Sequence, residues 1–427
     1  MKLRLRPRLA FASIEYWLFV IAIGLTTESI IGNAYQKILW VVLGACGFLF
    51  TMNRNLLVKD SMAKLAYMYI CPYIIMAIYT LFLSLFSNVS GVPSQAFTTV
   101  VYVICDVFLA YLLVKKYKEK SVVMLSQAIV ISYSFSLVYV LYNYGIASIP
   151  LYFAYEYSFY SKFLEKNDIS QAAVLIILFF LYLKIFKRQL KNTYQYKIGL
   201  IIPLLLVIIA MSGKRTGYLA LLIGVFVIIL IKLLQKSRQV YSIILPIIVF
   251  LLIFVFIYSI NSGMLESLLD YLGINSMGRM EVYSYFNDSY TLSPLYFGKG
   301  FQYIHMYMVE GLGTPLVNDF QYLHNSFLQL YIEIGFWGFS AWFIFYLFYY
   351  KSFLTRRGGR RIEEFYIVIL MSMFSVFAFD NILTYPFYQV TFCTLLFVFL
   401  DIVKINMANP PLDEYHKVEN WSNLKLI

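Results

Sequence analysis

The sequence predicts an all-α, polytopic integral membrane protein with about twelve membrane-spanning helices and one long external loop. Hydrophobic residues make up 61% of the 427 residues and charged residues only 13%, whereas soluble domains average about 45–50% apolar and about 25% charged residues. Long apolar runs recur along the whole chain, and lysine and arginine gather in alternate connections between them. Together these observations exclude a soluble globular protein.

Each expected span is an apolar run near the length of about 20 residues that a helix needs to cross a bilayer. The basic segment 1–8 precedes the first run without a signal-peptide cleavage pattern, so we expect the first run to remain as an anchor helix. The second and seventh runs are short. In order, the runs are 14–31, 38–52, 65–86, 97–114, 122–142, 169–186, 198–212, 218–234, 243–260, 327–349, 365–381 and 383–403.

The basic residues predict the orientation of these spans. Cytoplasmic loops carry an excess of Lys and Arg because these residues resist translocation. With the N-terminus inside and the sides alternating, 27 of the 34 basic residues fall on the cytoplasmic side. The alternation therefore predicts a multi-pass protein of the cell membrane with both termini in the cytoplasm.

The charge and the cysteines favour neither nucleic-acid binding nor a disulfide or metal site. The formal charge of +12 is explained by this alternation, so we expect no nucleic-acid partner. The four cysteines, Cys46, Cys71, Cys105 and Cys393, each lie in an apolar run and form no CxxC or His/Cys cluster. We therefore expect neither a disulfide framework nor a metal site, and no cofactor.

Residues 261–323 form the only long connection, and we expect them to be external within one transmembrane domain that spans 1–427. The segment carries six acids against two basic residues, a formal charge of −4. Leu265, Leu268, Leu269 and Leu272 recur at helical spacing, which predicts short amphipathic helices that lie against the bundle.

His324 lies where this external segment meets the tenth apolar run, which we expect to be one membrane helix. A histidine can serve as a general base near neutral pH. The alternative is structural, because His324 could instead cap the helix that starts near Ser326.

Arg215 lies in the tight external connection Met211-Ser-Gly-Lys-Arg-Thr-Gly217. A cation outside is a poor topological anchor, and a guanidinium suits bidentate phosphate recognition. Lys214 adds charge beside it, and Gly213 and Gly217 would allow a ligand to approach the backbone closely. The alternative is that Arg215 is only an anchor.

The remaining candidates are also polar groups at the same membrane face. Arg279 follows Gly278 in the external loop and could equally pair with a loop acid such as Glu281. The candidate substrate-binding residues, besides Lys214, are Asn325, Gly298, Gly300 and Asp380. Asp106 lies near the middle of the fourth run, where a carboxylate is either functional or held by a partner, and its role stays open.

These residues form a pattern that resembles the superfamily of O-antigen polymerases, capsular polysaccharide polymerases and O-antigen ligases. The resemblance covers roughly residues 169–345 and includes Asn167. It is carried by the run from Met211 to Leu222, by Gly278-Arg279, and by Gly298-x-Gly300, His324-Asn325-x-x-Leu328 and Glu333-x-Gly335-x-x-Gly338.

The resemblance implies a GT-C-like helical bundle in a bacterial inner membrane that acts on undecaprenyl-diphosphate-linked oligosaccharides, as donor and acceptor, at the external face without a metal. It further implies that Arg215 and Arg279 hold the diphosphate and that His324 assists the attacking hydroxyl. Where the family's first arginine often follows Ser or Thr directly, Lys214 intervenes here. The choice between Arg215 and Lys214 therefore stays open at the level of sequence.

Elementary chemistry agrees with these roles. Fixed cations at the lipid–water boundary would stabilise the charge that develops on a diphosphate leaving group, and the aromatic residues of the external loop could stack on sugar rings. We expect a polysaccharide polymerase, with a chain-length regulator and a flippase as further partners. The alternatives are a ligase that transfers finished glycan and, from another class, a lipid-linked sugar transporter. A transporter would favour internal repeats, and the sequence shows none.

Overall fold

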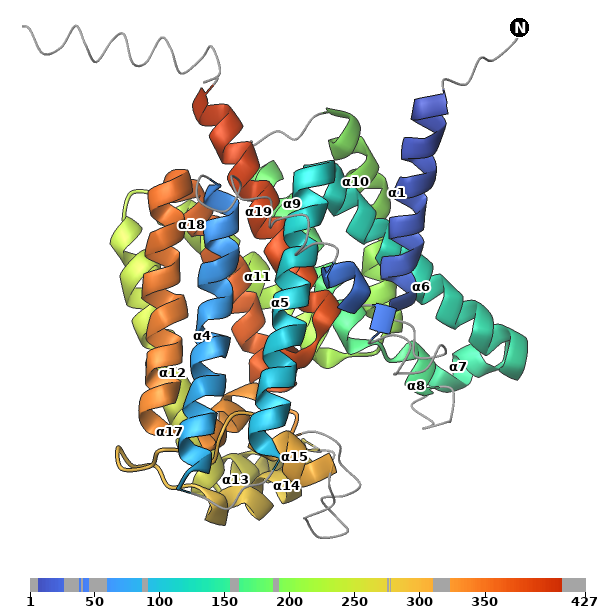
Figure 1. Cartoon of the computed structure of the whole chain (residues 1–427). Helices are drawn as coiled ribbons and strands as arrows, with labels where there is room; N and C mark the ends of the chain where they lie inside the picture. The colour runs from blue at the N-terminus through green and yellow to red at the C-terminus, as the bar shows by residue number, and fades with distance from the viewer. Residues whose placement is uncertain are drawn as a thin grey trace, which may run out of the picture.

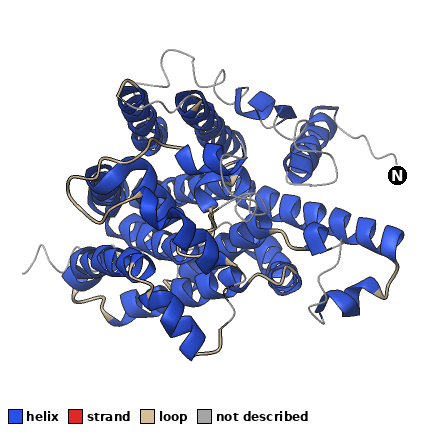
Figure 2. Ribbon diagram, turned by 90° about the horizontal axis from the view of Figure 1, so that it is seen from below, coloured by secondary structure: helices blue, strands red, loops and turns tan. Residues whose placement is uncertain are grey.

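The computed structural model describes residues 7–26, 38–39, 41–45, 60–86, 91–153, 161–186, 192–274, 276, 278–309 and 323–408. Within these residues every regular element is a helix and no strand is present, as Figure 2 shows from below (Figure 2). Eight of the described helices are long and apolar enough to cross a membrane. The predicted fold class, an all-α polytopic membrane protein, is confirmed.

The long helices form a bundle in which chain-distant elements lie side by side (Figure 1). In chain order they are α1 (Pro7–Thr26), α4 (Ser61–Ser84), α5 (Val92–Tyr117), α6 (Lys120–Tyr144), α9 (Asn167–Ile185), α10 (Asn192–Met211), α11 (Arg215–Leu233), α12 (Leu245–Asn261, preceded by the π-helical η1, Val240–Ile244), α17 (Ser326–Ile344, continued by the π-helical η3, Phe345–Tyr350), α18 (Lys351–Phe377) and α19 (Pro386–Ala408). The buried side of α9, α18 and α19 forms the centre of one apolar core.

The observed spans differ in number from the expected twelve. The first and seventh runs appear as shorter apolar helices, Ile14–Leu25 and Gly199–Met211. Most of the second run, 38–52, lies outside the described residues. The tenth and eleventh runs lie in one continuous helical stretch, Ser326–Phe377.

That stretch is not straight, because the chain reverses at Gly335. Its backbone there is non-helical, with φ 68° and ψ −176°. The Phe327 and Phe343 rings are 5.6 Å apart, whereas 16 residues of straight helix would separate them by about 24 Å. Tyr331 and Phe339, also placed evenly about Gly335, are 5.5 Å apart. The expectation of one membrane helix over 327–349 is therefore wrong, because the chain reverses within it.

A second interruption lies at Gly359, with φ 68° and ψ −165°. It separates the helical segment that follows Gly335 from the remainder of α18. The ring of Tyr350 lies 5.5 Å from that of Tyr366, and the ring of Phe343 lies 5.2 Å from that of Phe374. The segment after Gly335 and the end of α18 are therefore antiparallel neighbours. As a result the first nine residues of α17 pack beside the C-terminal end of α18.

The short helices of the segment that the sequence predicts to be external cluster at one end of the bundle, opposite the N-terminus (Figure 1). They are α13 (Met264–Tyr271), α14 (Arg279–Phe286, followed by η2, Asn287–Ser289) and α15 (Tyr303–Val309). α14 buries Val282, Tyr283 and Phe286. α13 fully buries none of its residues, and Leu268 is exposed, but Leu265 is partly buried against the core and α13 contacts α12, as expected for a short helix that lies against the bundle.

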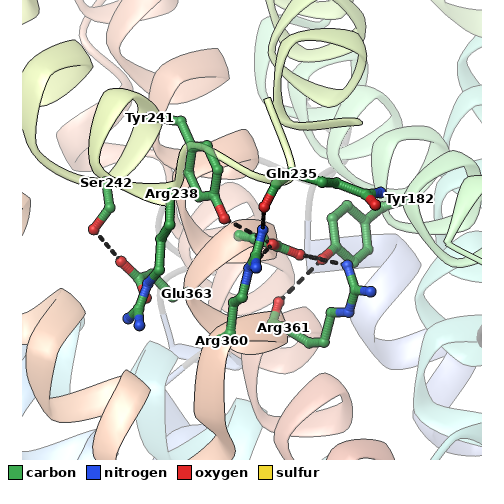
Figure 3. Close-up of polar contacts among 9 residues, drawn as sticks. Tyr182, Gln235, Arg238, Tyr241, Ser242, Arg360, Arg361 and Glu363 are labelled. Atoms are coloured by element: carbon green, nitrogen blue, oxygen red, sulfur yellow. Dashed lines mark hydrogen bonds and ion pairs between the residues drawn. The ribbon is translucent and has the colours of Figure 1, made fainter. Parts of the chain in front are cut away.

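At the opposite end of the bundle, two adjacent carboxylates of α18 are buried among arginines (Figure 3). Glu364 accepts hydrogen bonds from Arg360 Nε at 2.7 Å, Arg361 Nη1 at 2.8 Å, Tyr241 Oη at 2.9 Å and Tyr182 Oη at 3.0 Å. Tyr182 belongs to α9 and Tyr241 to η1. One carboxylate therefore joins three segments of the chain.

The neighbouring Glu363 makes a second set of contacts. It forms an ion pair with Arg238 and accepts a hydrogen bond from the Ser242 hydroxyl, while Lys351 donates to the carbonyl oxygen of Ser242. The two glutamates together connect the middle of α18 to α9 and η1.

We expect Glu364→Ala to lower the free energy of unfolding by about 3–5 kcal/mol, because the substitution leaves several buried donors without an acceptor. Thermal unfolding of the purified protein in detergent would measure the loss. The matched control is Glu15→Ala, which removes a carboxylate that pairs with Lys116 at the surface and should cost less than about 1 kcal/mol. Equal effects of the two substitutions would contradict the bracing role of Glu364.

The orientation in the membrane is a further prediction. The cluster Arg356–Arg361 should lie in the cytoplasm and the external helices outside. With a membrane-impermeant maleimide applied to whole cells, we expect Leu295→Cys, at a position 81% exposed, to be labelled and Arg356→Cys to be labelled only after lysis. Labelling of Arg356→Cys in intact cells would reverse the topology.

Candidate active site

His324 lies at the entrance to α17 in a left-handed backbone conformation, with φ 52°. The helix is capped by the next residue, since Asn325 Oδ1 accepts from Leu328 N at 3.0 Å. The capping role that the sequence left open for His324 therefore belongs to Asn325. The His324 side chain is about one-third exposed, at 32%, while Asn325 is fully buried.

Asp380, which follows α18, is the residue that His324 faces. His324 Nδ1 lies 3.4 Å from Asp380 Oδ1, at the long end of the hydrogen-bond range. The same carboxylate oxygen accepts from Tyr385 Oη at 2.8 Å and from Asn381 N at 2.9 Å. The carbonyl oxygen of Asp380 accepts from Ser326 Oγ at 2.7 Å, which ties the start of α17 to this loop.

Asp380 is buried, yet the pKa of its carboxyl is lowered. Burial by itself would raise the pKa of this carboxyl, but the hydrogen bonds and charge of His324, with Tyr385 and Asn381 N, outweigh it and lower the pKa below its ordinary value. An anionic carboxylate beside His324 orients the imidazole and stabilises it when it takes up a proton. Asp380 is therefore placed behind His324 as an orienting group and does not stand alone as a ligand for substrate.

Arg279 reaches this site through α14. It begins the helix after Gly278, and Tyr283 one turn later donates its hydroxyl to the His324 carbonyl oxygen at 3.2 Å. Burial raises the pKa of Tyr283 to about 12, and the charge of Arg279 opposes that rise. The structure therefore brings Arg279 and His324 to the same end of the bundle, with Tyr283 between their elements.

Arg215 begins α11 at this end too. Ser372, near the end of α18, donates to the Ala220 carbonyl oxygen at 3.1 Å, so the start of α11 lies level with the end of α18 that leads to Asp380. Gly217 permits α11 to approach α9 closely, because a Cβ there would lie 2.8 Å from Ser170 Oγ. Gln171 Nε2 then donates to Thr216 Oγ1 at 3.0 Å.

The structure distinguishes Lys214 from Arg215. Lys214 Nζ forms an ion pair with Glu165 Oε2 at 2.7 Å. Arg215 is exposed, and among the residues that the structure describes it forms no ion pair. Of the two neighbouring cations, Arg215 is the one available to an anionic ligand.

α9 lies between the two halves of the site. Tyr385, which holds Asp380, also reaches Asn167 at the first position of α9. One turn later on the same helix, Gln171 contacts Thr216 beside Arg215. Sequence reasoning missed Tyr283 and Tyr385, and no signal distinguishes them among the 39 tyrosines of the chain.

The glycine turn 298–300 packs against α17 near Gly335 and has a structural role, rather than lying open to a substrate. Gly300 N donates to the Glu333 carbonyl oxygen at 2.7 Å, and Phe336 N donates to the Tyr296 carbonyl oxygen at 2.9 Å. A Cβ on Gly298 would lie 2.5 Å from Glu333 O, and one on Gly335 would lie 2.4 Å from Tyr296 O. Gly298 and Gly300 thus let the loop dock into the reversal at Gly335.

Glu333 and Asp106 lie away from His324. Glu333 is fully buried, and its Oε1 accepts from Gln329 Nε2 at 3.0 Å and from Ile304 N at 3.3 Å, which anchors the start of α15. Asp106 is buried in α5 among Tyr73, Cys105 and Cys393. In the described part of the chain, no three His, Cys, Asp or Glu side chains are grouped so that they could hold a metal ion.

Comparison with known proteins supports the resemblance that the motifs indicate. Residues 198–343 match a family model described as O-antigen ligase. This range contains Arg215, Arg279 and His324 and ends before Asp380. A search of curated proteins found no match.

Proposed function

Residues 198–343 carry the O-antigen ligase family match, consistent with the superfamily of O-antigen polymerases and ligases, and from this premise we propose that the protein is a lipid-linked polysaccharide polymerase. It would transfer a growing glycan from undecaprenyl diphosphate to the next lipid-linked repeat unit, at the external face of a bacterial inner membrane. Members of the matched family are membrane glycosyltransferase-like enzymes.

The observation that carries the proposal is the set of charges around His324. His324 lies 3.4 Å from the buried carboxylate of Asp380. The helices that begin with Arg215 and Arg279 start at the same end of the bundle. A base and two cations are suited to glycosyl transfer from a diphosphate, because one can accept the proton of the acceptor and the others can stabilise the leaving group.

In the proposed reaction, His324 accepts the proton of an acceptor sugar hydroxyl as its oxygen bonds to the anomeric carbon of the donor. The bond between that carbon and the diphosphate oxygen breaks, and the electron pair leaves with undecaprenyl diphosphate. Arg215 and Arg279 would stabilise the charge that develops there, and Asp380 would stabilise the imidazolium. The proton finally passes to solvent or to the leaving group.

A ligase is the second candidate, because the matched family model is itself described as a ligase. A ligase would use the same donor chemistry and differ only in the acceptor, such as a lipid core or a protein. The same site residues would therefore serve either activity, and only the product distinguishes a polymerase from a ligase.

Analysis of lipid-linked products in a strain that lacks this protein tests the proposal. Accumulation of single lipid-linked repeat units at the external face of the membrane indicates a polymerase, and accumulation of long unattached chains indicates a ligase. Substrate trapped on the cytoplasmic side would indicate a flippase and contradict both proposals.

A further inference from the structure

α11 has two faces of opposite character. One is buried against α9 and α18 through Gly217, Ala220, Gly224, Val227 and Ile231. The other consists of Tyr218, Leu222, Phe226, Ile229 and Leu233, whose exposed fractions run from 42% for Tyr218 to 77% for Leu233. We call these five residues the α11 stripe.

Arg215 lies at the end of the α11 stripe and in register with it. The stripe residues follow Arg215 by 3, 7, 11, 14 and 18 positions, which is the spacing of one helix face. The stripe runs about 22 Å along the helix axis, out of a hydrocarbon core of about 30 Å. An anion held by Arg215 would therefore stand at the head of an apolar track that crosses most of the membrane.

The cation at the head distinguishes this track from the lipid-facing surface of α12. α12 also has an exposed apolar face, formed by Ile247, Leu251, Val255 and Tyr258. It ends at Asn261 and Ser262, which carry no charge. Ordinary bilayer lipid explains the α12 face, whereas the α11 stripe adds an exposed guanidinium whose neighbour Lys214 is already paired with Glu165.

We propose that the α11 stripe is the docking track for the polyprenyl tail of the lipid-linked substrate, with its diphosphate at Arg215. The proposal rests on the proposed function for the identity of this lipid. It adds the path of the tail, which would hold the anomeric carbon at a constant depth relative to His324. It also explains why the phosphate-binding arginine begins a membrane helix rather than lying in the external loop.

Site-specific photo-crosslinking in the full-length protein tests the track. We would prepare Leu222→p-benzoylphenylalanine and Phe226→p-benzoylphenylalanine on α11, with Leu251→p-benzoylphenylalanine and Val255→p-benzoylphenylalanine on α12 as matched controls. Each variant would be placed in nanodiscs of phosphatidylethanolamine and phosphatidylglycerol with a trace of radiolabelled undecaprenyl diphosphate. We expect crosslinks at positions 222 and 226 to exceed those at 251 and 255.

Two further experiments test whether the crosslinking depends on Arg215 and on the diphosphate headgroup. Adding Arg215→Gln should reduce crosslinking at 222 and 226 roughly 10- to 100-fold, because hydrogen bonds to a charged group are lost, and should leave the α12 positions unchanged. Radiolabelled undecaprenol, which lacks the diphosphate, should show no preference for α11. Thermal unfolding of the Arg215→Gln protein checks that the exposed substitution leaves the fold intact.

Equal crosslinking on the two helices, or crosslinks that persist in Arg215→Gln, would mean only boundary lipid and overturn the track. Glycan transfer is measured on the same preparations, so the two proposals can fail separately. If the protein transfers glycan but crosslinking shows no preference for α11, the proposed function stands and the docking track is rejected. If crosslinking favours α11 and depends on Arg215, but the wild-type protein transfers no glycan, the docking track stands and the proposed enzymatic function is rejected.

Discussion

Replacing His324 with asparagine is expected to lower the rate of glycan transfer by about 10²–10⁴-fold, the usual contribution of a positioned general base. Donor binding should be largely retained, because Arg215, Arg279 and the membrane helices would hold the lipid diphosphate. The measurement is transfer by purified protein with lipid-linked substrate, beside donor binding and thermal stability.

Asparagine is the informative replacement because it preserves the local structure. His324 has φ 52°, a conformation that Asn adopts more readily than Ala. The cap of α17 is supplied by Asn325 in either protein. A loss of activity in His324→Asn would therefore be caused by the missing imidazole and not by disruption of the start of α17.

His305 provides a matched control, since it is another histidine of the chain and lies on α15. His305→Asn should retain most of the activity. Asp380→Asn should lower kcat with little effect on KM for the donor, because it removes the charge that orients His324 without touching the diphosphate. A well-folded and fully active His324→Asn protein would show that His324 is not the base.

Loss of Arg215 is the second large effect we expect. Removing one group that stabilises charge in the transition state typically costs about 10²–10³-fold in kcat, so Arg215→Ala should lose most glycan transfer. Arg215→Lys should recover little of it, because an ammonium cannot reproduce bidentate contact with a phosphate.

Lys214 cannot substitute for Arg215 in these variants, since its ammonium is paired with Glu165 at 2.7 Å. Lys214→Ala removes only a partly exposed ion pair, worth about 0–1 kcal/mol, and serves as the control. Near wild-type activity of Arg215→Lys would show that only charge is needed. A deeper loss in Lys214→Ala than in Arg215→Ala would assign the phosphate to Lys214.

The choice between these two neighbours shows where sequence reasoning reached its limit. Both are cations in one short connection, and local pattern treats them alike. The partner that separates them, Glu165, lies 49 positions away in the chain. The same holds for His324, whose partners Asp380 and Tyr283 lie 56 and 41 positions away.

Gly335 is a second instance. Apolar residues continue on both sides of it, so hydropathy predicts one straight helix. The reversal depends on a loop from another part of the chain, since Tyr296 and Gly298 occupy the space that a Cβ at Gly335 would need. The glycines of this motif are visible in the sequence, but their use as a docking point for backbone is visible only in the fold.

The sequence by itself determined the membrane class, the helical architecture and the residues that carry the family resemblance. These follow from hydropathy and local motifs, which are properties of short windows of the chain. Only the tertiary structure decided that Asn325 caps α17, that Asp380 stands behind His324, and that Arg215 rather than Lys214 is open to a ligand. Hydrogen bonds and ion pairs act over a few ångströms between residues far apart in sequence, so their partners exist only once the helices have packed.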